Sequence, residues 1–304
     1  MKRVFKITVL LIVSCIAIVA LVAGYLFLYE GEYDGLIDIN GDSKVFIHRG
    51  YGNHAPDNSL SGAKIAVGDG FTGVDVDAQY SKDKQVVVFH DVDIDRFTSG
   101  TGRVASFTLV ELQEHDISIA YGDDDFAGEK IATFEDFVRE ITPQAQLMVE
   151  LKVSSAGDTG IERSVSEILE RYDAHDQVLI SAFNPVVLYR LKKIDSRIRT
   201  VFIFMDQGWD TKRVAQTKKE DRVSLPWYLR TEWTRVAIRN LIKPDALSIN
   251  YEVEEETIDQ LIQKGYPVFL WSLNDEEAIS FGVDKKPYGL ITDEPFLIKE
   301  ITGF

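Results

Sequence analysis

Histidines and carboxylates recur at the points where candidate β-strands end. Asp75 and Asp77 share one face of an extended run, because strand side chains alternate, and Glu150 ends a later run. Three buried carboxylates are costly unless a cation binds between them, and hard oxygen ligands select Mg²⁺ or Ca²⁺. His48 and His90 flank this set, so two imidazoles are available for acid and base work. These residue types indicate a metal site with acid–base chemistry.

Arg49 and Lys152 follow two of the same strands and add positive charges that do not titrate near neutral pH. A cation, a guanidinium and an ammonium together form a binding site for a phosphoryl group. With two imidazoles, such a site predicts chemistry at a P–O bond. Each residue alone has a simpler interpretation, since a strand-end histidine is usually structural and Asp-x-Asp is usually an edge or turn feature. Only the combination is specific.

The elements that must position these residues alternate between strands and helices. Residues 44–304 number 261, which suits a (β/α)8 barrel of ~250 residues, whose functional groups lie at the carboxyl ends of the strands. Short β-branched or aromatic runs predict strands at Val45–His48, Gly73–Ala78, Val86–His90, Leu147–Leu151, Val178–Phe183, Thr200–Phe204, Ala246–Ile249, Val268–Leu273 and Leu290–Thr292. Apolar residues at three- and four-residue steps predict helices between them, among them Ile161–Arg171, Pro185–Lys193 and Glu254–Lys264.

Nine candidate strands are one more than a barrel of eight requires. Only seven residues separate the second candidate from the third, too few for a parallel crossover of about a dozen or more. We therefore expect a β-hairpin that turns near residues 81–84 and returns His90 beside Asp75 and Asp77. Eight strands then remain for the barrel.

The order of these residues resembles the glycerophosphodiester phosphodiesterase family. The family pattern opens with His-Arg-Gly, here residues 48–50, and continues with Glu-x-Asp, here Asp75-Val76-Asp77. The later motifs match Val87-Val88-Phe89-His90-Asp91, Glu150-Leu151-Lys152, Ser181-Ala182-Phe183-Asn184, Trp271-Ser272-Leu273-Asn274 and Thr292-Asp293-Glu294-Pro295. The resemblance runs in order through residues 45–296.

The resemblance implies a metal-dependent phosphodiesterase on a (β/α)8 barrel. It assigns one divalent cation to the three carboxylates, the phosphoryl oxygens to Arg49 and Lys152, and acid–base catalysis to His48 and His90. Which histidine donates a proton, and whether water or a substrate hydroxyl attacks, stays open. Asp75 stands where the family usually carries Glu, and this shorter side chain favours Ca²⁺, whose coordination is variable, over strictly octahedral Mg²⁺.

The implied reaction is hydrolysis of glycerophosphodiesters to an alcohol and glycerol 3-phosphate. Two alternatives stay open: a membrane-anchored lysophospholipase D acting on single-chain lipids, and a catalytically silent phosphate-binding sensor domain. Trp271 is the expected wall of the substrate site. Four further aromatic residues either fill the core under a long loop or form a wall for an acyl chain or the membrane surface: Trp209, Trp227, Tyr228 and Trp233.

The first 30 residues predict a membrane anchor. Ile7–Leu28 is uncharged over 22 residues, which as a helix at ~1.5 Å per residue matches the hydrocarbon core of a bilayer. This run is too long for a cleaved signal peptide, and it continues well beyond the lipoprotein-like Cys15. Basic residues precede it and acids follow it. We therefore expect a single-pass helix with a cytoplasmic N-terminus and the remainder outside, in the periplasm or the extracellular space.

Composition excludes several other classes. The 33 Lys+Arg against 49 Asp+Glu give a formal net charge of −16, which argues against a nucleic-acid groove. A single cysteine excludes an intramolecular disulfide framework. The expected domains are the anchor (1–30), an acidic spacer (31–43) that reaches at most ~45 Å when extended, and one barrel (44–304). The expected partners are a glycerophosphodiester or lysophospholipid and the membrane.

Overall fold

Eight parallel strands form the centre of the molecule. The computed structural model describes the chain apart from residues 1, 32, 39–42, 207–225, 227–228 and 304. Pairing of the first strand with the last closes a barrel of β1 (Lys44–His48), β2 (Gly73–Tyr80), β4 (Gln146–Leu151), β5 (Val178–Ala182), β6 (Arg199–Phe204), β7 (Ala246–Asn250), β8 (Val268–Trp271) and β9 (Gly289–Thr292). All eight lie within two residues of their predicted boundaries, so the expected (β/α)8 barrel is confirmed.

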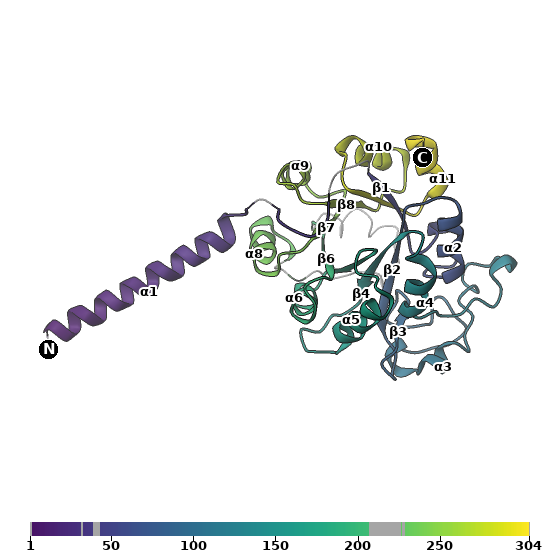
Figure 1. The fold of residues 1–304 in the computed structure, drawn as a ribbon, viewed down its shortest axis with the longest axis horizontal. Coiled ribbons are helices and arrows are strands. Elements are labelled where there is room, and N and C mark those ends of the chain that lie inside the picture. Colours follow the sequence, from purple (N-terminus) through teal and green to yellow (C-terminus); the bar gives the residue numbers. More distant parts are fainter. Residues whose placement is uncertain (1, 32, 39–42, 207–225, 227–228, 304) are drawn as a thin grey trace.

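Helices surround the strands (Figure 1). Capping residues start them: the Ser59 hydroxyl accepts a hydrogen bond from the Gly62 amide, and Thr133 and Asp136 form a capping box. Pro185 occupies a first helical position, where no amide hydrogen is needed. The helices are α2 (Leu60–Gly68), α3 (Leu109–Leu112), α4 (Phe134–Ile141), α5 (Ile161–Tyr172), α6 (Pro185–Ile194), α8 (Glu232–Ile242), α9 (Glu255–Gln263), α10 (Glu276–Lys285) and α11 (Pro295–Thr302).

β3 (Val86–Val88) runs antiparallel to β2 and forms the predicted hairpin. The Ser81 amide donates to the Gln85 carbonyl at 3.0 Å, and Lys84 takes the left-handed conformation, with φ 63°, within this turn. Beyond β3, the Phe89 amide donates to the Asp77 carbonyl at 2.8 Å. This contact returns the next residue, a histidine, to the carboxyl end of β2. The following segment encloses an apolar cluster that the sequence did not predict: Val87, Phe89, Ile94, Val104, Leu112, Ile117 and Ile131.

Aromatic side chains fill the amino-terminal end of the barrel. Phe46 and Phe269 meet edge to face, with ring centroids 5.2 Å apart, inside a layer to which seven of the eight strands contribute. Gly73 and Gly289 make room for these rings, since a Cβ on Gly289 would lie 2.3 Å from a ring carbon of Phe269. This packed layer closes one end of the barrel. Only the carboxyl ends of the strands are left for a site.

The segment that precedes β1 is docked on the closed end. The Tyr33 hydroxyl donates to the Asp245 carbonyl at 2.6 Å and accepts from the Ile37 amide at 3.1 Å. Ile37 is 5% exposed and joins the apolar layer inside the barrel. The expectation of a free spacer is therefore wrong for residues 33–37, because burial of a large apolar side chain favours docking over an exposed chain.

α1 (Lys2–Leu28) leaves the barrel beside α8 (Figure 1). Its stretch Phe5–Leu28 has 24 residues, a mean hydropathy of 2.9 and no buried part. The predicted apolar helix is confirmed, and it is long enough to cross a membrane. A membrane anchor and a signal sequence share these properties.

Replacement of Ile37 tests whether the docked segment stabilises the barrel. Ile37→Ala should lower the free energy of unfolding by about 2–5 kcal/mol, because it removes a buried apolar side chain and leaves a cavity. Leu36→Ala, at the neighbouring residue that is 50% exposed, should change it by less than ~0.5 kcal/mol. Urea unfolding of both full-length variants in one detergent measures the difference. Equal stability of the two variants would show that the segment is not part of the folded barrel.

Candidate active site

Three neighbouring strands bring the predicted acids to the carboxyl end of the barrel. β1 pairs with β2 so that His48 lies beside Asp75, and β2 pairs with β4 so that Asp77 lies beside Glu150. Lys152 comes directly after β4. Residues far apart in the sequence therefore become neighbours because parallel strands end at the same edge of the barrel.

Asp77 is the most enclosed of the three carboxylates, with 6% of its side chain exposed. Lys152 Nζ lies 2.9 Å from its Oδ1, and Arg49 Nε lies 3.6 Å from its Oδ2. Asn58 donates to Oδ2 at 3.1 Å and accepts from the Asp77 amide at 2.8 Å. Burial alone would raise the pKa of Asp77, but the charges of Lys152, His90 and Arg49 hold this pKa well below its usual range.

The negative charge of Asp75 is compensated far less than that of Asp77. Its Oδ2 lies 4.0 Å from His48 Nε2, beyond hydrogen-bond distance. Burial raises the pKa of Asp75 to about 7 against the charge of His48, and the charges of Asp77 and Glu150 add repulsion. Lys152 Nζ contacts Glu150 Oε2 at 2.8 Å and is thus shared between two acids. A divalent cation among the three carboxylates would supply the missing charge, so the donor set fits a hard cation.

Each histidine is oriented by a carboxylate. His48 Nδ1 lies 2.6 Å from Asp293 Oδ1, and His90 Nδ1 lies 2.6 Å from Asp91 Oδ1. A carboxylate accepts the proton of Nδ1, which leaves Nε2 of the same ring for exchange with a ligand. About a quarter of each imidazole is exposed, 27% for His48 and 28% for His90, so a ligand can reach both rings.

The two imidazoles differ in proton affinity. Burial lowers the pKa of His48, but the Asp293 carboxylate outweighs burial, and the pKa of His48 is raised. Burial and the charge of Lys152 lower the pKa of His90, and Asp77 opposes them only in part. Burial would raise the pKa of Asp293, yet the charge and hydrogen bond of His48 hold it at about 2. Surroundings that separate two pKa values are typical of acid–base pairs.

The loop after β1 holds Arg49 and Asn58 in place. Both have left-handed backbones, with φ 52° and φ 60°, which non-glycine residues adopt at a cost. The Asn58 amide donates to the Arg49 carbonyl at 2.8 Å, and Arg49 Nη1 donates to Asp57 Oδ2 at 2.7 Å. Gly52 lets the loop approach β9, since a Cβ there would lie 2.1 Å from the Asp293 carbonyl oxygen. Strained positions held in this way cluster at functional sites.

The structure brings all seven predicted polar residues together: His48, Arg49, Asp75, Asp77, His90, Glu150 and Lys152. Three further residues join the same network: Asn58, Asp91 and Asp293. The sequence analysis gave them no role in the site, although Asp91 adjoins His90 and Asp293 directly follows β9. The contact of Asn58 with Asp77 could not be predicted, because it depends on the path of a loop.

Of the aromatic residues considered for the substrate site, only some lie near the strand ends. Trp271 ends β8, and its ring meets that of Phe183, which follows β5, at a centroid distance of 6.2 Å. Trp233 is 51% exposed on α8 and packs on Phe27 of α1, so the core-filling interpretation is wrong for this residue. It does not line the strand ends either. The remaining three lie outside the described residues: Trp209, Trp227 and Tyr228.

A second group of potential metal ligands lies on the helical surface. Glu170, His175 and Asp195 bring ligand atoms together, but Arg197 forms ion pairs with both acids. The charge of these acids is already compensated by the guanidinium. This group lacks the excess of carboxylates found at the strand ends.

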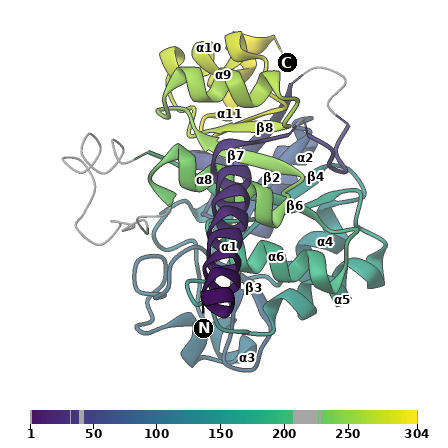
Figure 2. The ribbon, with the colours of Figure 1, turned by 90° about the vertical axis from the view of Figure 1, so that its left-hand side faces the viewer.

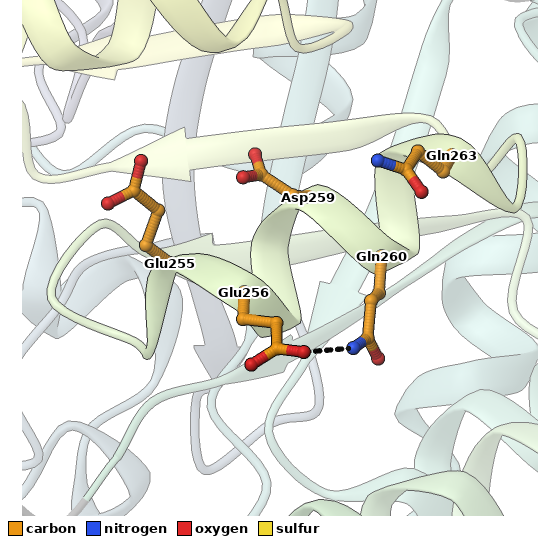
Figure 3. A pocket seen from close by; sticks show the side chains of 5 residues that line it. All are labelled: Glu255, Glu256, Asp259, Gln260 and Gln263. Carbon is orange, nitrogen blue, oxygen red and sulfur yellow. Dashed lines mark hydrogen bonds between the residues drawn. The ribbon is translucent and has the colours of Figure 1, made fainter.

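Figure 3 shows a surface hollow along one side of α9, formed by that helix alone. Lys285 of α10 ion-pairs with two of its acids, at 2.5 Å and 2.8 Å. The hollow therefore lacks a set of converging elements, and Lys285 compensates part of its negative charge. Its lining residues are Glu255, Glu256, Asp259, Gln260 and Gln263.

Asp293→Asn should lower the pKa of His48, because the substitution removes the negative charge that raises this pKa against burial. NMR titration of the imidazole nitrogens measures the pKa of both histidines in the parent and the variant. His90 is the internal control, since Asp77 and Asp91 oppose burial at that ring. An unchanged pKa of His48, or equal shifts of both pKa values, would contradict the assigned pairing.

Comparison with known proteins gives one consistent result. The glycerophosphoryl diester phosphodiesterase family matches residues 48–297. A glycerophosphodiester phosphodiesterase of Caldanaerobacter subterraneus is 27% identical over 259 residues, which cover 83% of this chain and 94% of that protein. Glycerophosphodiester phosphodiesterase 1 of Bos taurus is 23% identical over 81% of this chain and 76% of its own length.

Solved structures share the fold. A phosphodiesterase of Oleispira antarctica, in complex with the product sn-glycerol-3-phosphate, superposes with a TM-score of 0.70 at 22% identity, over 86% of this chain and 98% of that one. A glycerophosphodiester phosphodiesterase of Thermotoga maritima gives a TM-score of 0.63 at 23% identity, over 86% and 99%. The family match spans all but the first strand of the barrel and includes every predicted polar site residue, and the chain therefore belongs to the glycerophosphoryl diester phosphodiesterase family.

Proposed function

We propose that the barrel is a metal-dependent phosphodiesterase that hydrolyses glycerophosphodiesters to an alcohol and glycerol 3-phosphate. One observation carries the proposal: two histidines, each with a carboxylate on Nδ1, flank a cluster of acids in which Lys152 and Arg49 compensate Asp77. Family membership supplies the reaction class, hydrolysis of a phosphoric diester. The bound product of the Oleispira antarctica relative is the phosphate ester expected here.

Asp75, Asp77 and Glu150 would hold one divalent cation in this proposal. The cation supplies positive charge for the phosphoryl oxygens as negative charge develops on them. Burial, together with repulsion from Asp77 and Glu150, raises the pKa of Asp75 to about 7, and a bound cation would offset both effects. The short side chain of Asp75 favours Ca²⁺, whose ligand number and distances are flexible, over Mg²⁺.

Arg49 and Lys152 would bind the phosphoryl group. Their side chains are 19% and 21% exposed, so a ligand can reach part of each side chain while Asp77 contacts both. A planar guanidinium binds two phosphoryl oxygens at once, whereas an ammonium acts as a point charge. Asp77 and Asn58 therefore serve to position the two basic groups. Trp271 would form a wall for the alcohol part of the substrate.

The two imidazoles would move the protons. Hydrolysis needs one proton for the departing alkoxide and removal of one proton from the nucleophile. Because Asp293 and Asp91 accept from Nδ1 of each ring, Nε2 is the atom that donates or receives the proton. Asp293 also stabilises the charged form of His48, which raises the pKa of that ring. Whichever histidine acts as the acid, the protons move through Nε2 of His48 and Nε2 of His90.

α1 would be an uncleaved anchor, with its N-terminus in the cytoplasm and the barrel outside. The distribution of basic and acidic residues around the span supports this orientation. Retention of the helix is supported by contacts of its own last turn, where Asn240 donates to the Leu26 carbonyl and the ring of Phe27 packs on Trp233. A cleaved signal sequence has no need for such contacts with the barrel.

A substrate panel tests the reaction. The full-length protein in detergent is incubated with glycerophosphocholine, glycerophosphoethanolamine and lysophosphatidylcholine, with and without Ca²⁺ or Mg²⁺. We expect faster hydrolysis of the two water-soluble diesters, because Trp233, one residue considered for an acyl-chain wall, lies outside the strand-end site. Faster hydrolysis of the lysolipid would favour lysophospholipase D. No turnover of any diester would favour the silent sensor domain.

Removal of the cation should abolish turnover, because three clustered carboxylates then repel one another and the phosphoryl group loses its main positive partner. Chelation followed by re-addition of Ca²⁺ measures loss and recovery. Glu150→Gln should weaken Ca²⁺ binding in calorimetry, whereas Glu140→Gln, at an acid on α4, should not. Full activity of chelated protein that elemental analysis shows to be metal-free would rule out the assigned ligands.

His48→Ala and His90→Ala should each lower kcat by ~10²- to 10⁴-fold, the usual contribution of acid–base catalysis. His54→Ala is the matched control, since His54 lies in the same loop as Arg49 and faces Glu294 at 3.6 Å. Steady-state kinetics with glycerophosphocholine, together with thermal unfolding, separates a catalytic loss from a folding defect. Near-normal kcat in either of the first two variants would make that histidine structural.

A further inference from the structure

α8 has an unusual distribution of side chains for a helix on the outside of a barrel. Its two arginines, Arg235 and Arg239, point inward, and each is 1% exposed. Trp233 and Leu241, in contrast, are 51% and 59% exposed. Helical spacing places four residues without charge on one outward stripe: Trp233, Val236, Asn240 and Leu241. A helix that faces water would carry its charges on this side.

α1 ends against this stripe. Asn240 Nδ2 donates to the Leu26 carbonyl at 2.9 Å and to the Tyr29 carbonyl at 2.6 Å, and so satisfies acceptors at the end of α1. The rings of Phe27 and Trp233 pack with centroids 5.2 Å apart. Figures 1 and 2 show the two helices side by side. The last turn of α1 and the stripe on α8 therefore lie at the same height along the axis of α1.

A buried ion pair fixes this arrangement. Glu30, whose side chain is 3% exposed, is held by two nitrogens of Arg239 and by Lys264 Nζ at 2.6 Å. The Tyr33 amide then donates to the Lys264 carbonyl at 3.2 Å. Separation of these groups would leave a buried charge without compensation. The contacts of Glu30 and Tyr33 thus join the end of the helix to the barrel.

We propose that the outward stripe of α8, together with Tyr25 and Tyr29, is a membrane-contact surface that lies among the headgroups of a phospholipid bilayer. This inference rests on the proposed role of α1 as an anchor. If α1 spans the hydrocarbon core up to Leu28, its last turn lies at the interface, and Trp233 shares that depth. Tyr25 and Tyr29 are 59% and 56% exposed and stack on each other. Tyrosine and tryptophan are enriched at this depth in membrane proteins.

The contact determines the orientation of the barrel. α8 is one of the helices that surround the strands, and α1 leaves from beside it (Figure 1). The membrane therefore faces the side of the barrel, and the strand ends with His48 and Asp77 open along the membrane surface rather than into it. A water-soluble diester reaches such a site without leaving the aqueous phase.

Site-specific fluorescence tests the contact surface. The full-length protein with Cys15→Ser receives one new cysteine, Leu241→Cys on the stripe or Val110→Cys as control, and each is labelled with an environment-sensitive dye. Val110 is 71% exposed on α3, so both sites carry an exposed aliphatic side chain. In phosphatidylcholine vesicles, nitroxide-labelled lipids should quench the dye at residue 241 and leave the dye at residue 110 unchanged. Equal quenching at both sites, or none at residue 241, would overturn the inference.

Two controls separate the possible failures. Vesicle flotation reports the anchor alone, so a protein that floats while residue 241 stays unquenched contradicts only the contact surface. A protein that does not float contradicts the anchor and, with it, the surface. Spectral change at residue 241 that disappears on dilution with excess lipid would assign the stripe to a second copy of the chain and overturn the proposal.

Glu30→Ala tests whether the ion pair of Glu30 holds the helix against the barrel. This substitution removes the partner of Arg239 and Lys264 and should reduce quenching at residue 241, while flotation is retained. Asp34→Ala, which removes a nearby exposed acid, should leave the quenching unchanged. Circular dichroism confirms that both variants are folded. Quenching that is unaffected by Glu30→Ala would show that the ion pair does not hold the surface against the membrane.

Discussion

The burial of the Asp77 carboxylate is the constraint on which the rest of the site depends. A buried negative charge is stable only with positive partners and hydrogen bonds, and here Lys152, Arg49 and Asn58 supply them. These contacts constrain the position of each partner. Lys152 must follow β4 directly, and the loop after β1 must take a left-handed turn at Arg49. The basic groups of Arg49 and Lys152 are thus held in position by the protein itself.

The two ends of the barrel have opposite character, and this separates the attachment of the apolar helix α1 from the site. Apolar rings and Ile37 pack the amino-terminal end, where the segment after α1 docks. Acids, imidazoles and basic groups occupy the carboxyl end, where strand pairing concentrates them. Contacts of Glu30 with Arg239 of α8 and with Lys264 at the end of α9 join the apolar helix to the barrel without reaching the site. Stability and chemistry therefore depend on different residues.

Sequence alone predicted the features that depend on local pattern. Strands follow from short β-branched runs, and the hairpin follows from seven residues that cannot form a crossover. The polar site residues end those strands, so topology alone assembles them. Docking of residues 33–37 was missed, because its contacts join residues more than 200 positions apart. Trp233 was misplaced because the inward face of α8 is lined by arginines, which reverses the usual pattern.

The central claim is that the site breaks the P–O bond to the alcohol of the substrate and leaves glycerol 3-phosphate. Hydrolysis of glycerophosphocholine by the full-length protein with Ca²⁺ in water enriched in oxygen-18 tests it most directly. Attack at phosphorus, by water or through a cyclic phosphate that water then opens, places the heavy oxygen in glycerol 3-phosphate. Mass spectrometry should therefore find it in that product and not in choline. Heavy oxygen in choline, or phosphocholine as the product, would contradict the account.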